Sequence, residues 1–370
     1  MRRKVTYIIS DVDRALAFEW IAGQLDTRRF ELSFVLIRPG SSELQRYLEN
    51  HRIPVLLIES GGKKDWPAAW WKLYRYLRVY QPDIVHCHLL QACILGLTAA
   101  WFAGIRQRIY TRHHSSLHHV YFPKGVWWDK LFNRLATKII AISKPVKEIL
   151  VEWEKAPEEK VVLIPHGFKL EAYSDPESAT LSLLKALYNP EGKSPVIGVV
   201  SRFTEWKGVQ YIIPAFRRIL DRYPDALLLL FNAEGDYSKE ISKVLDRLPE
   251  GSYKTIKFEK EMAAAWHLFD VFVHSPIDYH SEAFGQIYIE AMAAGIPMVA
   301  TRSGIGVDIL KHEFNALVVP YQDPDAIEQA LLQLLDSQAL RGQMIANGRI
   351  TARQFELNFM MQRLEKLYES

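Results

Sequence analysis

The stretch Glu282-Ala-Phe-Gly-Gln-Ile-Tyr-Ile-Glu290, followed at once by Ala-Met-Ala-Ala-Gly-Ile-Pro-Met-Val-Ala300, decides the fold. It predicts a loop, a helix with a small-residue face and then a buried strand. Glu282 and Glu290 stand eight positions apart across the start of that helix. A helix start presents free N–H groups and a partial positive charge, which suits a phosphate or a sugar hydroxyl. We therefore expect the amides of residues 285–287 and the two acids to face a ligand rich in hydroxyls.

A structural role is the alternative for the same two acids. Glu282 would then cap the helix and Glu290 would be a solvated acid on its surface. The segment Ala-Met-Ala-Ala-Gly after Glu290 predicts a helix face that packs closely. That close packing favours the ligand-binding interpretation.

Length and composition indicate a globular protein of two domains. The chain has 370 residues, of which 49% are hydrophobic and 24% charged. A net charge of +3 is too small to suggest a nucleic-acid partner. Cys87 and Cys93 form no zinc pattern, and we expect reduced, buried thiols. The apolar run near the N-terminus stops at Asp11, so it predicts a strand and not an export signal, and no run is long enough for a membrane span.

Apolar runs alternate with helical patterns along the whole chain, as in parallel sheets covered on both faces. The first half predicts helices over 90–102 and 145–153 and strands over 5–9, 32–37, 55–58, 84–87, 108–110, 139–142 and 161–164. The second half predicts strands over 196–200, 226–231, 255–258, 271–274, 297–300 and 316–319, with a helical tail over 324–368.

A turn-rich interval separates the two halves. We predict an α/β protein with an N-terminal Rossmann-like domain over 1–168, a linker over 169–194 and a C-terminal Rossmann-like domain over 195–352. Both are doubly wound parallel sheets, and a last helix over 353–370 is expected to pack back on the first. Ligands of such sheets bind beyond the C-terminal strand ends, so we expect these ends to face one cleft.

Basic residues follow the first strand of the second half. Arg202 and Lys207 lie in one short loop before a predicted helix. A planar guanidinium grips two phosphate oxygens while an ammonium supplies a point charge, so the pair suits a diphosphate. The alternative is a solvated pair of surface cations.

Histidines follow the strand that ends at Tyr110 in the sequence Thr-Arg-His113-His114-Ser-Ser-Leu-His118-His119. One histidine at the strand end is expected to hydrogen-bond a sugar hydroxyl or a main-chain carbonyl. A metal site is the less favoured alternative, because no carboxylate or cysteine adjoins them in the sequence.

The segment 66–80 predicts a helix with a core-facing stripe and an outward side that carries Trp71, Lys72, Arg75 and Arg78. A basic face with indole rings suits an anionic membrane surface as well as water. The segment 120–131 is a second patch of this kind.

Several segments resemble signature segments of the retaining family-four glycosyltransferases of GT-B fold. They are Pro82-Asp-Ile-Val-His-Cys-His, Ile140-Ala-Ile-Ser143-Lys, Lys160-Val-Val-Leu-Ile-Pro-His-Gly167-Phe, Val200-Ser-Arg202-Phe-Thr-Glu-Trp-Lys207-Gly208-Val, the stretch 282–301 and Asn315-Ala-Leu-Val-Val-Pro320. The likeness extends from about residue 80 to the end of the chain.

The resemblance implies a transferase that moves a sugar from a UDP- or GDP-type donor to a glycan or lipid-linked acceptor, with retention and without a bound metal or other cofactor. Arg202 and Lys207 would take the diphosphate and Glu290 the ribose hydroxyls. Glu282 would contact the transferred sugar. The active-site histidine falls on His113, with His114 as the second choice. The amides of four residues would sit against donor sugar and phosphate: Phe284, Gly285, Gln286 and Ile287.

Two positions depart from the family pattern. Residues 13–17 read Asp-Arg-Ala-Leu-Ala where a glycine-rich turn is usual, and 232–236 read Asn-Ala-Glu-Gly-Asp where Gly-Asp-Gly is usual. Arg14 and Glu234 stand at these altered positions and are further candidates for the site.

Other functions of the same fold are a non-catalytic nucleotide-sugar binder and, less favoured, a sugar-nucleotide epimerase. We expect a cytoplasmic protein of polysaccharide or glycolipid synthesis, either free or at the inner face of the membrane.

Overall fold

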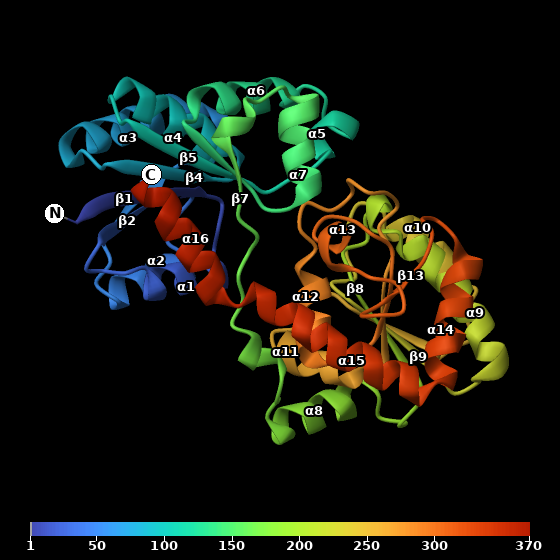
Figure 1. The fold of residues 1–370 in the computed structure, drawn as a ribbon. Helices are drawn as coiled ribbons and strands as arrows, with labels where there is room; N and C mark the ends of the chain where they lie inside the picture. The colour runs from blue at the N-terminus through green and yellow to red at the C-terminus, as the bar shows by residue number, and fades with distance from the viewer. Residues whose placement is uncertain (1) are drawn as a thin grey trace. The chain divides into compact units, whose positions relative to one another are not determined.

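The computed structural model describes residues 2–370 as two compact units (Figure 1). The first unit runs to Phe168 and includes Leu357–Ser370, and the second is Lys169–Glu356. Each is built on a parallel sheet, of seven strands in the first unit and six in the second. The predicted fold class, two Rossmann-like doubly wound domains, is confirmed.

The first sheet has the strand order β3-β2-β1-β4-β5-β6-β7. Its strands are β1 (Arg3–Ser10), β2 (Phe30–Arg38), β3 (Val55–Glu59), β4 (Ile84–His88), β5 (Gln107–Arg112), β6 (Lys138–Ala141) and β7 (Val161–Leu163). Every residue of β4 is buried, as expected of a central strand covered on both faces.

Helices cover both faces of this sheet, with α3, α4 and α6 on one side and α1, α2 and α16 on the other (Figure 1). The helices of the unit are α1 (Leu16–Gln24), α2 (Glu43–Asn50), α3 (Trp66–Tyr80), α4 (Leu90–Phe102), α5 (Leu117–Val120), α6 (Gly125–Leu135), α7 (Lys144–Glu148) and α16 (Leu357–Glu369). The helix predicted over 145–153 is α7, continued by a π-helical turn over Ile149–Trp153.

The last helix, α16, returns the chain to the first sheet. Tyr368 is fully buried, and its hydroxyl forms hydrogen bonds with the Tyr7 hydroxyl and with Nδ1 of His86, the latter at 2.7 Å. These buried polar groups all have hydrogen-bond partners, and the bonds fix the position of α16 on β1 and β4.

The second sheet has the order β10-β9-β8-β11-β12-β13. Its strands are β8 (Val196–Val200), β9 (Leu227–Phe231), β10 (Tyr253–Ile256), β11 (Val271–His274), β12 (Met298–Ala300) and β13 (Leu317–Val318). The helices are α8 (Ser178–Tyr188), α9 (Val209–Arg222), α10 (Ser238–Leu245), α11 (Met262–Ala265), α12 (Gln286–Ala294), α13 (Gly306–Ile309), α14 (Pro324–Asp336) and α15 (Gln338–Ala352).

The interval 169–194, expected to be a linker, has structure of its own within the second unit. It contains a 3-10 turn over Leu170–Tyr173 and helix α8. Leu184 is buried, and the Tyr188 ring lies edge-on against Phe231 at 5.4 Å. Apolar side chains among the turn residues therefore dock this interval onto the second sheet.

Candidate active site

The loop after β8 brings Lys207 against the loop after β11. Gly208 follows Lys207 with a φ of 71°, and a Cβ atom there would lie 1.8 Å from the carbonyl oxygen of Ser275. No side chain fits at that distance, so this position requires glycine. The resulting close approach sets Lys207 beside Glu282.

Glu282 is the acceptor at the centre of this site. Its Oε1 atom accepts a hydrogen bond from the Lys207 ammonium and lies 3.1 Å from Nε2 of His274. The backbone N–H of Glu282 donates to Oγ of Ser303 at 2.9 Å. Burial opposes ionisation of Glu282, but Lys207 and His274 outweigh it and lower the pKa of the carboxyl to about 2. Glu282 is therefore a fixed anion at neutral pH.

Arg202, by contrast, has its charge available. Its side chain is exposed, and among residues 2–370 it forms no ion pair or hydrogen bond through the guanidinium. A free guanidinium at the C-terminal end of β8 is placed as an anion-binding group requires. Of the two predicted diphosphate ligands, Arg202 is open to solvent and Lys207 is paired.

Glu290 lies on α12 and does not point into bulk water. It is 8% exposed, and three side chains donate to its carboxylate. The Tyr173 hydroxyl and Nε2 of Gln286 both reach Oε1 at 3.1 Å, and Nε1 of Trp266 reaches Oε2 at 3.3 Å. Burial raises the pKa of Glu290, and these hydrogen bonds oppose that shift. The carboxylate therefore has a fixed direction.

Helix α12 begins where the sequence predicts. Gly285 stands just before it with a φ of 80°, a left-handed conformation that glycine adopts without strain. The carbonyl of the buried Phe284 accepts from the Ile305 N–H at 2.7 Å. The first amides of the helix, those of Gln286 and Ile287, have no intrahelical acceptor. The predicted helix N-terminus, with free N–H groups that can bind an anion, thus lies between the two glutamates in the sequence.

His113 lies after β5 in the first unit. Its Nε2 shares a hydrogen bond of 3.0 Å with Nδ1 of His88, and its ring stacks on His166 at 5.7 Å. Burial, reinforced by neighbouring histidines, lowers the pKa of His113 to about 3. The ring is therefore neutral and suited to hydrogen bonding, not to carrying charge. His88, the last residue of β4, has no role in the sequence-based assignment.

The other histidines of the cluster belong to a buried ion network. His118 Nδ1 lies 2.7 Å from Asp129, His114 Nε2 lies 3.3 Å from Asp129, and His119 Nε2 lies 3.2 Å from Glu154. No carboxylate adjoins these histidines in the sequence, but in the fold α6 and the chain after α7 bring acids to them.

A buried guanidinium within this network argues against a metal ion. The ligand atoms of His114, His118 and Asp129 lie within 4.8 Å of one another, which is close enough to hold one. However, Arg112 contacts Asp129 at 3.1 Å and also binds Glu154. The buried Arg112 guanidinium already pairs with both carboxylates and would repel a cation at this position.

The two further candidates make surface contacts. Arg14 pairs with Glu19 at 3.3 Å and with Glu43 at 3.8 Å, and Glu234 lies 3.5 Å from Lys257. In the loop after β1, Asp11 takes the left-handed conformation, with a φ of 53°, although no glycine is present. An aspartate tolerates this region better than most residues.

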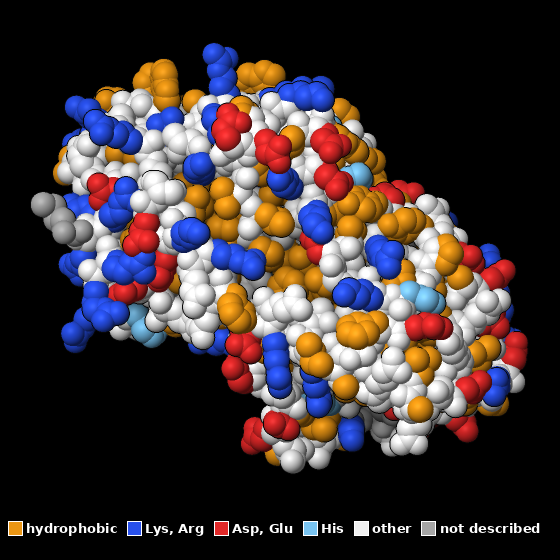
Figure 2. All heavy atoms as spheres, viewed as in Figure 1, with side chains coloured by type: hydrophobic (Ala, Val, Ile, Leu, Met, Phe, Trp, Pro, Cys, Tyr) orange, Lys and Arg blue, Asp and Glu red, His pale blue; other side chains and the backbone are white. Residues whose placement is uncertain are grey.

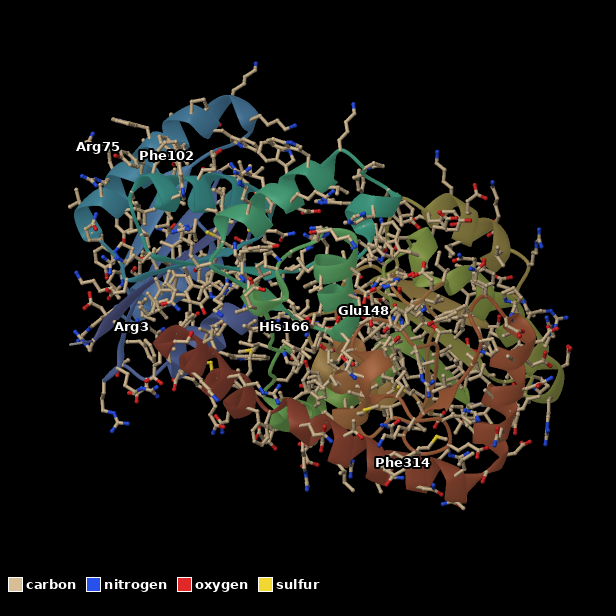
Figure 3. All side chains as sticks on the ribbon, turned by 45° about the horizontal axis from the view of Figure 1, so that its top comes forward. Arg3, Arg75, Phe102, Glu148, His166 and Phe314 are labelled. Atoms are coloured by element: carbon tan, nitrogen blue, oxygen red, sulfur yellow. The ribbon has the colours of Figure 1, made fainter. Side chains whose placement is uncertain are left out.

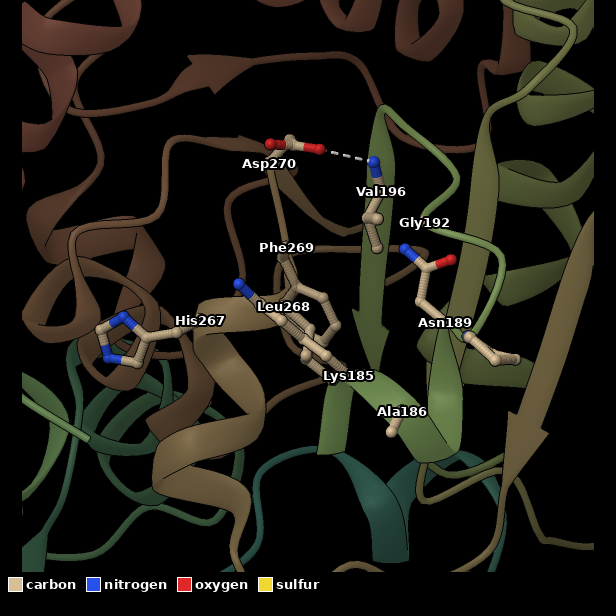
Figure 4. Close-up of a pocket in the computed structure, with 10 residues that line it drawn as sticks. Lys185, Ala186, Asn189, Gly192, Val196, His267, Leu268, Phe269 and Asp270 are labelled. Atoms are coloured by element: carbon tan, nitrogen blue, oxygen red, sulfur yellow. Dashed lines mark hydrogen bonds between the residues drawn. The ribbon is translucent and has the colours of Figure 1, made fainter. Parts of the chain in front are cut away.

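A cavity of about 480 Å³ opens elsewhere on the second unit (Figure 4). It lies at the N-terminal ends of β8 and β11, where Asp270 accepts a hydrogen bond of 2.7 Å from the Val196 N–H. Lys185, Asn189 and His267 also line it. Arg202 and Glu282 stand at the opposite, C-terminal edge of the same sheet, so this cavity is separate from the candidate site.

Comparison with known proteins agrees with the geometry. The model of Glycosyltransferase Family 4 matches residues 21–172, and that of Glycosyl transferases group 1 matches residues 184–351. The capsular polysaccharide biosynthesis glycosyltransferase CapM of Staphylococcus aureus is 26% identical over 300 residues, covering 78% of this chain and 77% of its own. A GDP-mannose-dependent alpha-mannosyltransferase of Mycobacterium tuberculosis is 25% identical over 306 residues, which cover 78% of this chain and 76% of the mannosyltransferase.

A solved structure is similar along nearly the whole chain. The Anabaena HepE protein in complex with UDP and glucose superposes with a TM-score of 0.84 at 19% identity, covering 99% of both chains. The two Rossmann-like units therefore define a GT-B fold. The matched family models extend the assignment from fold to family. The chain belongs to the family-four glycosyltransferases.

Proposed function

We propose that this glycosyltransferase moves a sugar from a nucleotide diphosphate sugar to a glycan or lipid-linked acceptor in polysaccharide or glycolipid synthesis. One observation carries the proposal: Arg202, Lys207, the start of α12 and two buried glutamates gather on one edge of the second sheet. The names of the relatives supply the donor classes, GDP-mannose in one and UDP with glucose in another.

Each group in the second unit has a role that its chemistry supports. Arg202 and Lys207 bind the diphosphate, and the first amides of α12 face the phosphate and the donor sugar. Glu290 accepts hydrogen bonds from the ribose hydroxyls, and its fixed carboxylate is suited to that role. Glu282 contacts the transferred sugar as an anion. From the first unit we propose His113, with its neutral ring, as the group that hydrogen-bonds a sugar hydroxyl.

We further propose that the transfer retains the anomeric configuration and needs no metal ion. The bond between the anomeric carbon and the diphosphate oxygen breaks while the acceptor oxygen attacks from the same face. The leaving phosphate takes the proton of the acceptor hydroxyl. Arg202, Lys207 and the helix dipole stabilise the charge that develops on the diphosphate. Glu282 is not a covalent nucleophile here, because its carboxylate is engaged by Lys207 and His274.

A panel of UDP- and GDP-sugars, followed by release of the nucleoside diphosphate, tests the proposed activity. We expect turnover with at least one donor and loss of that turnover in Glu282→Ala. Tight donor binding without turnover on any acceptor would instead identify a non-catalytic nucleotide-sugar binder, which the absence of glycine from residues 13–17 favours. Release of free epimerised sugar from the donor alone would identify an epimerase.

We also propose that the first unit contacts an anionic membrane. Trp71, Lys72, Arg75 and Arg78 are exposed on α3, and Trp101 and Phe102 are 53% and 59% exposed at the end of α4. Basic and hydrophobic side chains gather over the edge that carries these helices (Figure 2), and Arg75 and Phe102 lie at the same end of the unit (Figure 3). Such a face suits lipid headgroups. No helix within residues 2–370 has the length and apolar character of a membrane span.

A further inference from the structure

The C-terminal residue of β11, His274, is buried and held in one orientation by its neighbours. His274 is 1% exposed, and its ring stacks on Phe272 at 6.2 Å and meets Tyr288 edge-on at 5.0 Å. The His274 carbonyl accepts a hydrogen bond of 3.1 Å from the Thr301 N–H, next to the pairing of β11 with β12. Both the backbone and the ring of His274 are therefore held in place.

His274 and Lys207 donate to the same oxygen of Glu282. The two donors differ in rigidity, because Lys207 reaches the site on a flexible stem and is 16% exposed, whereas the His274 ring is buried against Phe272 and Tyr288. Burial lowers the pKa of His274, so its ring is neutral at neutral pH. A neutral imidazole facing an ionised carboxylate donates through Nε2–H.

Under the proposed function, Lys207 interacts with two anions, the Glu282 carboxylate and the diphosphate of the donor. A bound diphosphate carries more charge than one carboxylate and draws the flexible ammonium toward itself. The Ser303 hydroxyl fixes the backbone of Glu282 but not its carboxylate. Within residues 2–370, the side-chain donors to Glu282 are Lys207 and His274. When Lys207 moves to the diphosphate, His274 still donates its hydrogen bond to the carboxylate.

We propose that His274 is a positioning residue for the sugar transfer. Its Nε2–H directs the Glu282 carboxylate toward the transferred sugar while Lys207 binds the diphosphate. The inference rests on the proposed function, since it assigns His274 to the same site.

Replacing His274 separates positioning from donor binding. We expect His274→Leu to lower kcat about tenfold to a hundredfold, because small displacements of a positioned group have effects of that size. The affinities for UDP and GDP, measured by calorimetry, should stay unchanged. His274→Gln should restore much of kcat, because its side-chain N–H can replace Nε2–H, whereas the shorter His274→Asn should not. His312→Leu, which changes an exposed histidine of the same unit, is the matched control.

A double-mutant cycle tests whether His274 acts through Glu282. In a Glu282→Gln background, His274→Leu should lower the residual kcat much less than it does in the wild type. An equal loss in both backgrounds, a wild-type kcat for His274→Leu, or a fall in UDP affinity that matches the fall in kcat would overturn the inference. If His274→Leu does not fold, the comparison of the Gln and Asn variants decides. Absence of turnover in the wild type would instead refute the proposed function.

Discussion

Charge neutralisation of Glu282 should strengthen the binding of the free nucleoside diphosphate while it lowers the rate of transfer. The Lys207 ammonium is paired with Glu282 in the ligand-free structure. A diphosphate that recruits Lys207 must therefore weaken this ion pair. Glu282→Gln keeps the size of the side chain and one acceptor oxygen but removes its charge. Lys207 is then free to bind phosphate oxygens.

The pKa of Glu282 gives the magnitude. Its lowering from 4.5 to about 2 corresponds to about 3 kcal/mol in favour of the anion. This net value includes the opposing effect of burial, and His274 contributes to it as well as Lys207. We therefore assign about 1 to 2 kcal/mol to the competition for Lys207. That range corresponds to about five- to thirtyfold tighter binding of UDP or GDP in Glu282→Gln.

Protonation of Glu282 sets the pH range of the effect. A lowered carboxyl pKa contributes stability that is fully present above 4.5 and is lost as the pH falls through about 2. The gain in affinity should therefore be the same throughout the neutral range. The wild type should lose more stability than Glu282→Gln between pH 4.5 and 2.

Isothermal titration calorimetry of wild type and Glu282→Gln with UDP and with GDP measures the effect, alongside turnover of the donor found by the panel. Glu328→Gln is the matched control, because it removes the charge of a partly exposed glutamate that is likewise paired with a cation, Arg218, at 2.7 Å. Equal or weaker binding of both nucleotides by a folded Glu282→Gln would refute the argument that Lys207 is shared.

Three further changes have expected outcomes. Arg202→Ala should weaken UDP or GDP binding about ten- to a hundredfold, because it removes charge-assisted hydrogen bonds to phosphate; unchanged calorimetric affinity would remove Arg202 from the diphosphate site. Arg112→Leu should lower the free energy of unfolding in urea by about 3 to 5 kcal/mol, since Asp129 would be left buried without its guanidinium partner. The double change of Trp71 and Arg75 to serine should reduce co-flotation with anionic liposomes, and equal flotation of the variant and the wild type would contradict membrane contact through α3.

Much of the fold follows from local patterns in the sequence. Central strands such as β8 and β9 are continuous apolar runs, because both faces of a parallel sheet are covered, and their positions were predicted to within a few residues. Helix α4 was predicted with its observed bounds, because it is a mostly apolar and buried segment. The interval 169–194 was less well predicted, because its turn residues obscured the apolar side chains that dock it.

The partners of the site residues were harder to predict. Tyr173 reaches Glu290 across 117 positions of sequence, and Lys207 reaches Glu282 across 75. Two of the missed residues, His88 and His274, each end a strand. A histidine at a strand end was the weak signal that the sequence offered for them. Asp129 was missed as a neighbour of the histidines for the same reason of distance along the chain.

The sequence by itself determined the two parallel α/β units, the family and the edge of the sheet at which the charged residues gather. Periodicity and motif spacing are local properties that survive without coordinates. The tertiary structure alone decided that Lys207 is paired, that Arg202 is free, that Glu290 is held by three donors and that His274 stands behind Glu282. Charge pairing and burial depend on distances between residues far apart in the chain, and only packing fixes those distances.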